Sequence, residues 1–374
     1  MQSPLFICAV ILTGISSVVA AEAAPASTAA SPQVTVAPAQ EGTTLRARPA
    51  PQEGTPTVDL DVVVTDKSGK PVGGLGADSF TVLDDNRPSR ILSFHAYDGA
   101  SQSTEVPAQA IILFDTVNTT FDTVSYTRQQ VENFLRTNGG HLPVPVSLLW
   151  LTNDSLDPLS QPTLDGNALA GQLAAAEGRL RSINRSAGAW GAVERFQFST
   201  KMLDQFARKE MDQPGRKLLI WAGPGWPLLD GPNINLSGKA QQGVFNEIVQ
   251  LSTLLRLAHI DIYSISQGFS GPYTFLYQSF LKPVKKVNQA NIPDLSLKVL
   301  AVQSGGLVLP PTNDLAAAIR QCVQDASPFY TLSIAPTMAD NPAQYHDLKV
   351  RVDKPGLTAR TNTGYYGQPG PSAP

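Results

Sequence analysis

A polar run directly follows an apolar segment in "AIILFDTVNTTFD", residues 110–122. The apolar part predicts a buried strand that ends at Asp115, and Asn118 and Thr119 come shortly after it. A carboxylate with nearby hydroxyls suits a hard cation such as Mg²⁺, because Mg²⁺ takes oxygen ligands in an octahedral shell. In the alternative interpretation, Asp115 caps the following helix or turn, and Asn118 and Thr119 close the loop through their own backbone.

Short apolar runs alternate with helical periodicity between residues 108 and 326. Apolar residues recur at helical spacing over 244–255 and 315–326. Such alternation predicts a mainly parallel sheet covered by helices on both faces, with ligands outside the carboxyl ends of its strands. The expected strands are 111–114, 146–151, 217–221, 260–265 and 307–309.

The period of two residues that is typical of strands appears at both ends of this region. Residues 57–100 predict N-terminal strands, and residues 327–367 predict C-terminal strands that no helix covers. We expect the two groups to form one antiparallel β unit, a β-sandwich, with the α/β domain of residues 107–326 between them. Separate hairpins docked on the α/β domain would leave the same sequence pattern.

The N-terminal part has the composition of an export segment followed by a spacer. Residues 1–21 predict a signal peptide because Leu5 to Ala20 is apolar and small residues follow; an uncleaved membrane anchor is the alternative. Residues 22–56 are rich in Ala, Pro and Thr and predict a disordered linker, and 368–374 a disordered tail. No later segment is apolar enough to span a membrane after signal cleavage.

The charge of the chain argues against a nucleic-acid partner, and its cysteine content argues against an intrachain disulfide. The formal charge of −3 and the pI near 5.8 give no basic field for nucleic acid. Cys322 is the only cysteine beyond the signal segment, so an intrachain disulfide in the mature chain is not expected.

Six segments, by their order and spacing together, resemble von Willebrand factor A-type domains, and more closely the A-related version common in exported proteins of Acidobacteria. The resemblance covers nearly the whole mature chain. It implies a Rossmann-like doubly wound α/β domain and a metal-ion-dependent adhesion site. Together with the signal segment, it predicts a bacterial protein that is secreted or lies in the periplasm or cell envelope. The segments are "VVVTDKSGKPVGGLGADSFTVLDDNRPSRILSF", "IILFDTVNTT", "PGRKLLIWAGPGWP", "SGGLVLPPTNDLAAAI", "FYTLSIAP" and "LKVRVDKPGLTARTNTGYY".

The adhesion site that the resemblance implies has a D-x-S-x-S loop, a Thr from a second loop and a further Asp. Val117 stands where the first Ser belongs, and Gly223 to Gly225 stand where the further Asp belongs. Two interpretations remain: a degenerate site without metal, or a Mg²⁺ site. The residues that would hold Mg²⁺ are Asp115, Thr119 and Thr200, with Asn118 assisting.

Aromatic residues in two loops at the carboxyl edge of the sheet predict a protein-binding surface. They lie in the segments 223–238 and 269–280. Alternatively, these side chains fold back over the sheet as local core. The candidate binding residues are Trp226, Phe269, Tyr273 and Phe275, together with Asn118.

The sequence therefore predicts a non-enzymatic interaction or adhesion module. A hydrolase with a cryptic Ser-His-Asp site and a purely structural envelope component are the alternatives. Ser304 in "VQSGG" lacks the first glycine of a nucleophile elbow. A zinc site is not expected, since the histidines fall in different elements without an i, i+4 pair; they are His95, His141, His259 and His346.

Overall fold

The computed structural model describes most of the chain from residue 57 onward. The described residues are 57–98, 108–152, 154–176, 188–226, 236–268, 277–337, 339 and 341–367. The expected signal at 1–21, linker at 22–56 and tail at 368–374 lie outside them. So do three of the expected binding residues, Phe269, Tyr273 and Phe275.

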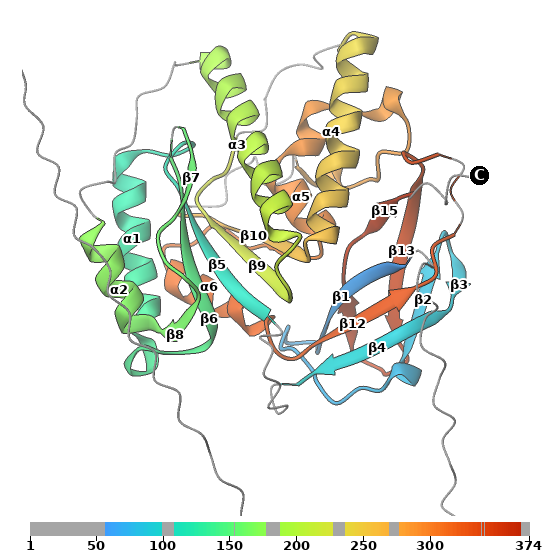
Figure 1. The fold of residues 1–374 in the computed structure, drawn as a ribbon, viewed down its shortest axis with the longest axis horizontal. Coiled ribbons are helices and arrows are strands. Elements are labelled where there is room, and N and C mark those ends of the chain that lie inside the picture. Colours follow the sequence, from blue (N-terminus) through green and yellow to red (C-terminus); the bar gives the residue numbers. More distant parts are fainter. Residues whose placement is uncertain are drawn as a thin grey trace, which may run out of the picture. The chain divides into compact units, whose positions relative to one another are not determined.

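The described chain is mixed α/β, as the alternation of strands and helices predicts, with one largely parallel sheet and two antiparallel sheets (Figure 1). The parallel strands of the seven-stranded sheet contain or overlap each strand expected between residues 108 and 326; β11 ends one residue earlier than expected. They are β5 (Ala108–Asp115), β6 (His141–Leu151), β9 (Arg216–Ala222), β10 (Ile260–Ile265) and β11 (Leu307–Val308). Two short strands pair antiparallel with β6: β7 (Leu156–Pro158) and β8 (Thr163–Asp165).

The strand order of this sheet reverses next to β5. The order is β11-β10-β9-β5-β6-β7, with β8 also on β6. The chain therefore leaves β5 toward β6 on one side and later returns to β9 on the other. In open α/β sheets, the ends of the strands at such a reversal form the crevice where ligands bind. Asp115 is the last residue of β5 and lies at this point.

Helices cover both faces of the seven-stranded sheet (Figure 1). Side chains alternate along β5, so that Ile112 and Phe114 pack on one face and Ile111 and Leu113 on the other. Because both faces are buried, β5 is a continuous apolar run. One face carries α1 (Phe121–Leu135), α2 (Gly166–Ala175) and α6 (Leu315–Gln324); the other carries α3 (Gly188–Glu210), α4 (Gly238–Leu257) and α5 (Leu297–Gln303).

The helices predicted at 244–255 and 315–326 are confirmed as α4 and α6. Among the described helices, none is both long enough and apolar enough to cross a membrane. Short 3-10 turns occupy Ala77–Ser79, Thr137–Gly140, Tyr277–Phe280, Val287–Gln289 and Ile292–Leu295.

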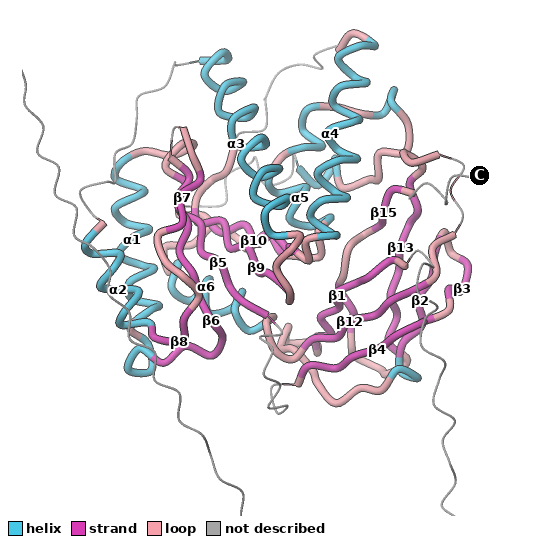
Figure 2. The backbone as a smooth tube through the Cα atoms, in the orientation of Figure 1, coloured by secondary structure: helices cyan, strands magenta, loops and turns pink. Residues whose placement is uncertain are grey.

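Strands from the two ends of the described chain pair with each other in two antiparallel sheets, drawn in magenta in Figure 2. One has the order β14-β1-β12-β4, and the other has the order β15-β13-β2-β3. The N-terminal strands are β1 (Val58–Thr65), β2 (Phe80–Asp84), β3 (Arg87–Ser89) and β4 (Ile91–Tyr97). The C-terminal strands are β12 (Phe329–Ile334), β13 (Tyr345–Val352), β14 (Thr358–Arg360) and β15 (Gly364–Tyr366).

The two antiparallel sheets share one hydrophobic cluster. In the register of β1 on β12, Leu60 lies opposite Leu332, and both are fully buried. Phe80 of β2 packs in the same cluster, with its ring centroid 5.0 Å from that of Tyr330. Every second residue of β1 faces this cluster, which is why the strand alternates apolar and polar residues in the sequence.

A buried polar network ties the two kinds of sheet together. Arg216, the first residue of β9, donates through Nε to Asp261 Oδ2 at 2.7 Å. Tyr263 donates its hydroxyl to Asp325 Oδ2 at 2.9 Å, and the same oxygen accepts a hydrogen bond from Arg360 of β14. Because buried charges are tolerated only when paired, this network fixes how β14 meets the C-terminal end of α6.

His259 provides a second polar link, and its protonation should affect stability. The residue follows α4 with φ of +53°, and its Nδ1 lies 2.9 Å from Asp61 Oδ2 in β1. The hydrogen bond to Asp61 raises the pKa of His259 above 6.5, against the lowering effect of burial. A raised pKa in the folded chain means that the pair stabilises the fold below the unfolded-state pKa. That stabilisation is lost as pH rises through the folded-state value.

We predict that His259→Asn, which tolerates the left-handed backbone, lowers the free energy of unfolding by up to about 1 kcal/mol at acidic pH. The difference from the wild type should shrink as pH rises above the raised pKa of His259. Urea unfolding at a series of pH values measures it, with the exposed His141→Asn as the matched control. A difference that grows with pH would contradict the assignment.

Candidate functional site

The carboxylate of Asp115 is buried and is satisfied by N–H donors of the protein. Only 2% of the residue is exposed. Oδ1 accepts hydrogen bonds from the backbone N–H groups of Val117 and Asn118, at 3.1 and 3.0 Å, and from the Asn118 side-chain amide at 3.1 Å. Oδ2 accepts from the same amide at 3.0 Å and from the indole Nε1 of Trp221 at 2.9 Å. Each carboxylate oxygen thus already has its partners within the chain.

The register of the sheet delivers the indole donor. Trp221 of β9 lies opposite Leu113 of β5, two residues before Asp115, and is 1% exposed. Asp115 and Trp221 thus stand close together at the carboxyl ends of adjacent parallel strands. A buried carboxylate needs hydrogen bonds in place of water, and an N–H bond to a charged acceptor is among the stronger ones.

Burial and hydrogen bonding act on the pKa of Asp115 in opposite directions. Burial raises the pKa because it disfavours the charged form, whereas the bonds from Trp221, Asn118 and Val117 lower it. The net direction is upward. The donors therefore offset only part of the cost of removing this carboxylate from water.

The residue after β9, Gly223, stands where the resembled family has a second carboxylate, and it lies too close to Asp115 to carry a side chain. A Cβ added at Gly223 would lie 2.7 Å from the Cβ of Asp115, which is closer than real Cβ contacts come. A side chain at this position would displace Asp115. Glycine at 223 and the carboxylate at 115 therefore belong to one packing arrangement.

These residues do not fit Mg²⁺. Both oxygens of Asp115 face N–H groups, Val117 offers no oxygen, and position 223 has no room for a side chain. The Asn118 Oδ1 is buried without a hydrogen-bond partner, but one neutral oxygen cannot supply the octahedral oxygen shell of Mg²⁺.

Asp115 and Asn118 contact each other, as the expected site requires. The two threonines expected at the site lie in a loop and in a helix. Thr119 is half-buried in the loop between β5 and α1. Thr200 lies inside α3, where its hydroxyl donates to the Gln197 carbonyl at 3.3 Å. With Asp204 and Glu247 it lines a hollow of about 250 Å³ between α3 and α4. Burial there raises the pKa of Glu247.

The residue of α3 that reaches the Asp115 cluster is Ser199. It is fully buried, and its Oγ accepts a hydrogen bond from the Asn118 amide at 3.1 Å. Sequence reasoning missed Ser199 and Trp221. A signal for Trp221 was present, since a tryptophan near the end of a core strand comes close to the end of the neighbouring strand.

Trp226 is a correction to the expected binding surface. The residue is 2% exposed, its indole Nε1 donates to the Leu295 carbonyl at 2.7 Å, and its ring packs edge-on against Trp221 at 5.3 Å. Two buried contacts therefore hold Trp226 as local core. It is not part of an exposed loop surface.

A larger hollow lies elsewhere on the α/β part. It has a volume of about 1180 Å³ and runs between α3 and the strands β6 and β7. Its lining includes Gln109 and Arg216, at the amino ends of β5 and β9. The hollow also reaches Asp154 and Ser155, past the carboxyl end of β6, but Asp115, Asn118 and Trp221 are not among its lining residues.

Two histidines are paired with aspartates, but Ser304, the serine considered as a nucleophile, forms its hydrogen bonds with other residues. His259 contacts Asp61, and His346 contacts Asp84. Ser304 is buried, donates to the Ala301 carbonyl at 3.0 Å and accepts the backbone N–H of Ile262 at 2.9 Å. These bonds give Ser304 a structural role between α5 and β10.

No family model matches the chain, and neither does any curated protein. Among solved structures, the chain is similar to the human COPII-coat protein Sec24c, with 9% identity and a TM-score of 0.33. The alignment covers 74% of this chain and 46% of that one, so the chain spans less than half the length of the matched protein.

We predict that Trp221→Phe lowers the free energy of unfolding by about 2 kcal/mol more than Trp150→Phe, because it removes a donor from a buried carboxylate. Trp150 is a matched control: it is 4% exposed and packs edge-on against Phe114, and its indole Nε1 has no hydrogen-bond partner. Chemical denaturation of both variants measures the difference. Equal losses would show that the bond from Trp221 to Asp115 contributes nothing.

Proposed function

We propose that the chain is an exported, non-enzymatic protein-interaction module of von Willebrand factor A type with a metal-free site at Asp115. The strand order supports a Rossmann-like domain of this kind. With β5, β6 and the antiparallel edge strand β7 numbered 1 to 3, β9 to β11 numbered 4 to 6, and β8 left out, the order is 3-2-1-4-5-6, which is the strand order of doubly wound folds that bind ligands at the reversal.

The observation that carries the proposal is the donor set around Asp115. The aspartate stands where the adhesion metal of the resembled family would be held, but N–H groups of Trp221 and Asn118 occupy its oxygens. The N–H donors present the positive ends of their dipoles to the carboxylate, in the place where a cation would present its charge. The loop is then fixed in shape without an ion, and recognition depends on its exposed side chains.

The exposed side chains next to Asp115 are suited to a protein partner. Phe121, the first residue of α1, is 54% exposed and directly follows the loop of Thr119 and Thr120. A large exposed aromatic ring at the ligand-binding edge of the sheet is the kind of residue that dominates interface energetics. We therefore assign Phe121 as the centre of the interaction surface.

The non-enzymatic part of the proposal is supported by how the histidines and Ser304 are used. A hydrolase would need a serine within hydrogen-bond reach of a histidine that an acid orients. Ser304 is instead bonded to Ala301 and Ile262. The proposed location, secreted or in the bacterial periplasm or cell envelope, is supported by the apolar segment from Leu5 to Ala20.

We predict that Phe121→Ala weakens partner binding roughly 30-fold, the effect of losing about 2 kcal/mol at an interface hot spot. The mature chain is used to capture a partner from a bacterial envelope extract, and the affinity of the captured protein is then measured with purified variants. Leu257→Ala is the matched control, because Leu257 is 39% exposed but ends α4, just before the amino end of β10.

Binding should persist in EDTA, since the proposed site uses no metal. Loss of binding in EDTA that returns with Mg²⁺ would contradict the metal-free proposal. Equal affinities of Phe121→Ala and Leu257→Ala would contradict the surface assignment.

A further inference from the structure

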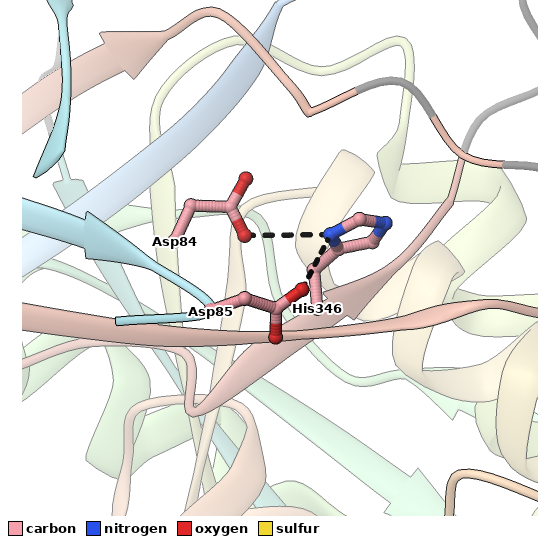
Figure 3. Close-up of side chains that lie close together, drawn as sticks. All are labelled: Asp84, Asp85 and His346. Carbon is pink, nitrogen blue, oxygen red and sulfur yellow. Dashed lines mark ion pairs between the residues drawn. The ribbon is translucent and has the colours of Figure 1, made fainter. Parts of the chain in front are cut away.

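A second polar cluster lies in the β-sandwich, far from Asp115 in the chain. Asp84 ends β2, Asp85 begins the turn to β3, and His346 belongs to β13 (Figure 3). The His346 Nδ1 is 3.4 Å from Asp84 Oδ1 and 3.1 Å from Asp85 Oδ2. The ligand-type atoms of the three residues all lie within 4.8 Å of one another.

Each aspartate has one oxygen tied to the protein and one directed at His346. Asp84 Oδ2 accepts the hydroxyls of Tyr365 and Thr337, at 2.8 and 2.6 Å. Asp85 Oδ1 accepts the backbone N–H of Asp347 at 3.0 Å. The carboxylates are thus held in orientation by neighbouring groups, as metal-binding carboxylates are.

Two of the three atoms that face one another, Asp84 Oδ1 and His346 Nδ1, are buried and lack hydrogen-bond partners. The third, Asp85 Oδ2, belongs to a side chain that is 41% exposed. Asp84 is 2% exposed and His346 is 1% exposed. Asp84 Oδ1 and both ring nitrogens of His346 have no hydrogen-bond partner. Buried polar atoms are rarely left in this state, and an imidazole N–H can point at only one of the two oxygens. A cation between the three atoms would satisfy the two oxygens and Nδ1 at once.

The geometry points to a divalent transition-metal site, best suited to Zn²⁺, formed by Asp84, Asp85 and His346. Zn²⁺ binds imidazole nitrogen and carboxylate oxygen at about 2.0 to 2.2 Å, which separates neighbouring tetrahedral ligands by about 3.3 Å. The separations of 3.1 and 3.4 Å from His346 Nδ1 to the two carboxylate oxygens match this spacing, and the two oxygens lie within 4.8 Å of each other. One nitrogen and two carboxylates favour Zn²⁺ over Mg²⁺ or Ca²⁺, which prefer shells of oxygen alone.

The surroundings allow the ion to enter and hold the ring in place. The Asp85 side chain is 41% exposed, so the site opens to solvent on the side of the turn and a water can complete the shell. The His346 ring stacks on Tyr365 at 4.8 Å with an interplanar angle of 11°. The bound ion would join the β2–β3 turn to β13. Neither the proposed interaction surface nor its metal-free loop is needed for this inference.

Zinc binding to the chelator-treated full chain, prepared without a histidine tag, tests the proposal by calorimetry, with Co²⁺ absorption as a second probe. We expect one saturable Zn²⁺ per chain, a melting temperature that rises with Zn²⁺, and a Co²⁺ spectrum typical of four- or five-fold coordination. Asp85→Gly and His346→Gln should each weaken binding roughly 100-fold or more.

Asp347→Asn is the matched control, because it removes the same charge beside His346 while its side chain pairs with Lys349. Its affinity should equal that of the wild type. Asp85→Gly keeps the test available if His346→Gln does not fold, since residue 85 lies in an exposed turn with φ of +49°, which glycine adopts readily. Absence of saturable binding to the wild type, or equal binding by Asp85→Gly, would overturn the proposal.

Discussion

The buried carboxylate of Asp115 is the constraint around which the carboxyl edge of the large sheet is arranged. A charge removed from water must be compensated locally. The compensation comes from the indole of Trp221, the amide of Asn118 and two backbone N–H groups. It also requires glycine at 223, where a Cβ would meet Asp115. β9, the β5–α1 loop and, through Ser199, α3 therefore all converge on one side chain.

Periodicity predicts the elements well because it reports burial directly. The continuous apolar run of β5 reflects burial of both faces of this strand, and the helical repeats of α4 and α6 reflect burial of one face of each helix. Periodicity does not report register or loop paths. The bond between Trp221 and Asp115 depends on which residues of two strands lie side by side. Trp226 was expected on a binding surface because it is an aromatic residue in a loop at the carboxyl edge of the sheet, but its ring is buried in the core.

The two carboxylate clusters contrast in how their oxygens are used. At Asp115, at the position of a metal site in the resembled family, N–H donors meet both oxygens. At Asp84, hydroxyl donors satisfy one oxygen, and the other faces a histidine without a hydrogen bond. Its partner residues come from strands near opposite ends of the chain, which pair directly with each other. Sequence spacing therefore gives no sign of this cluster, because only the pairing of β2 with β13 brings its residues together.

Whether Asp115 holds a cation can be tested by a crystal structure determined from crystals grown with millimolar Mn²⁺, which serves as an anomalous-scattering substitute for Mg²⁺. We expect no anomalous peak at Asp115 and an indole of Trp221 that still donates to its carboxylate. An anomalous peak within bonding distance of Asp115, with the Trp221 indole or the Asn118 amide turned away, would contradict this expectation.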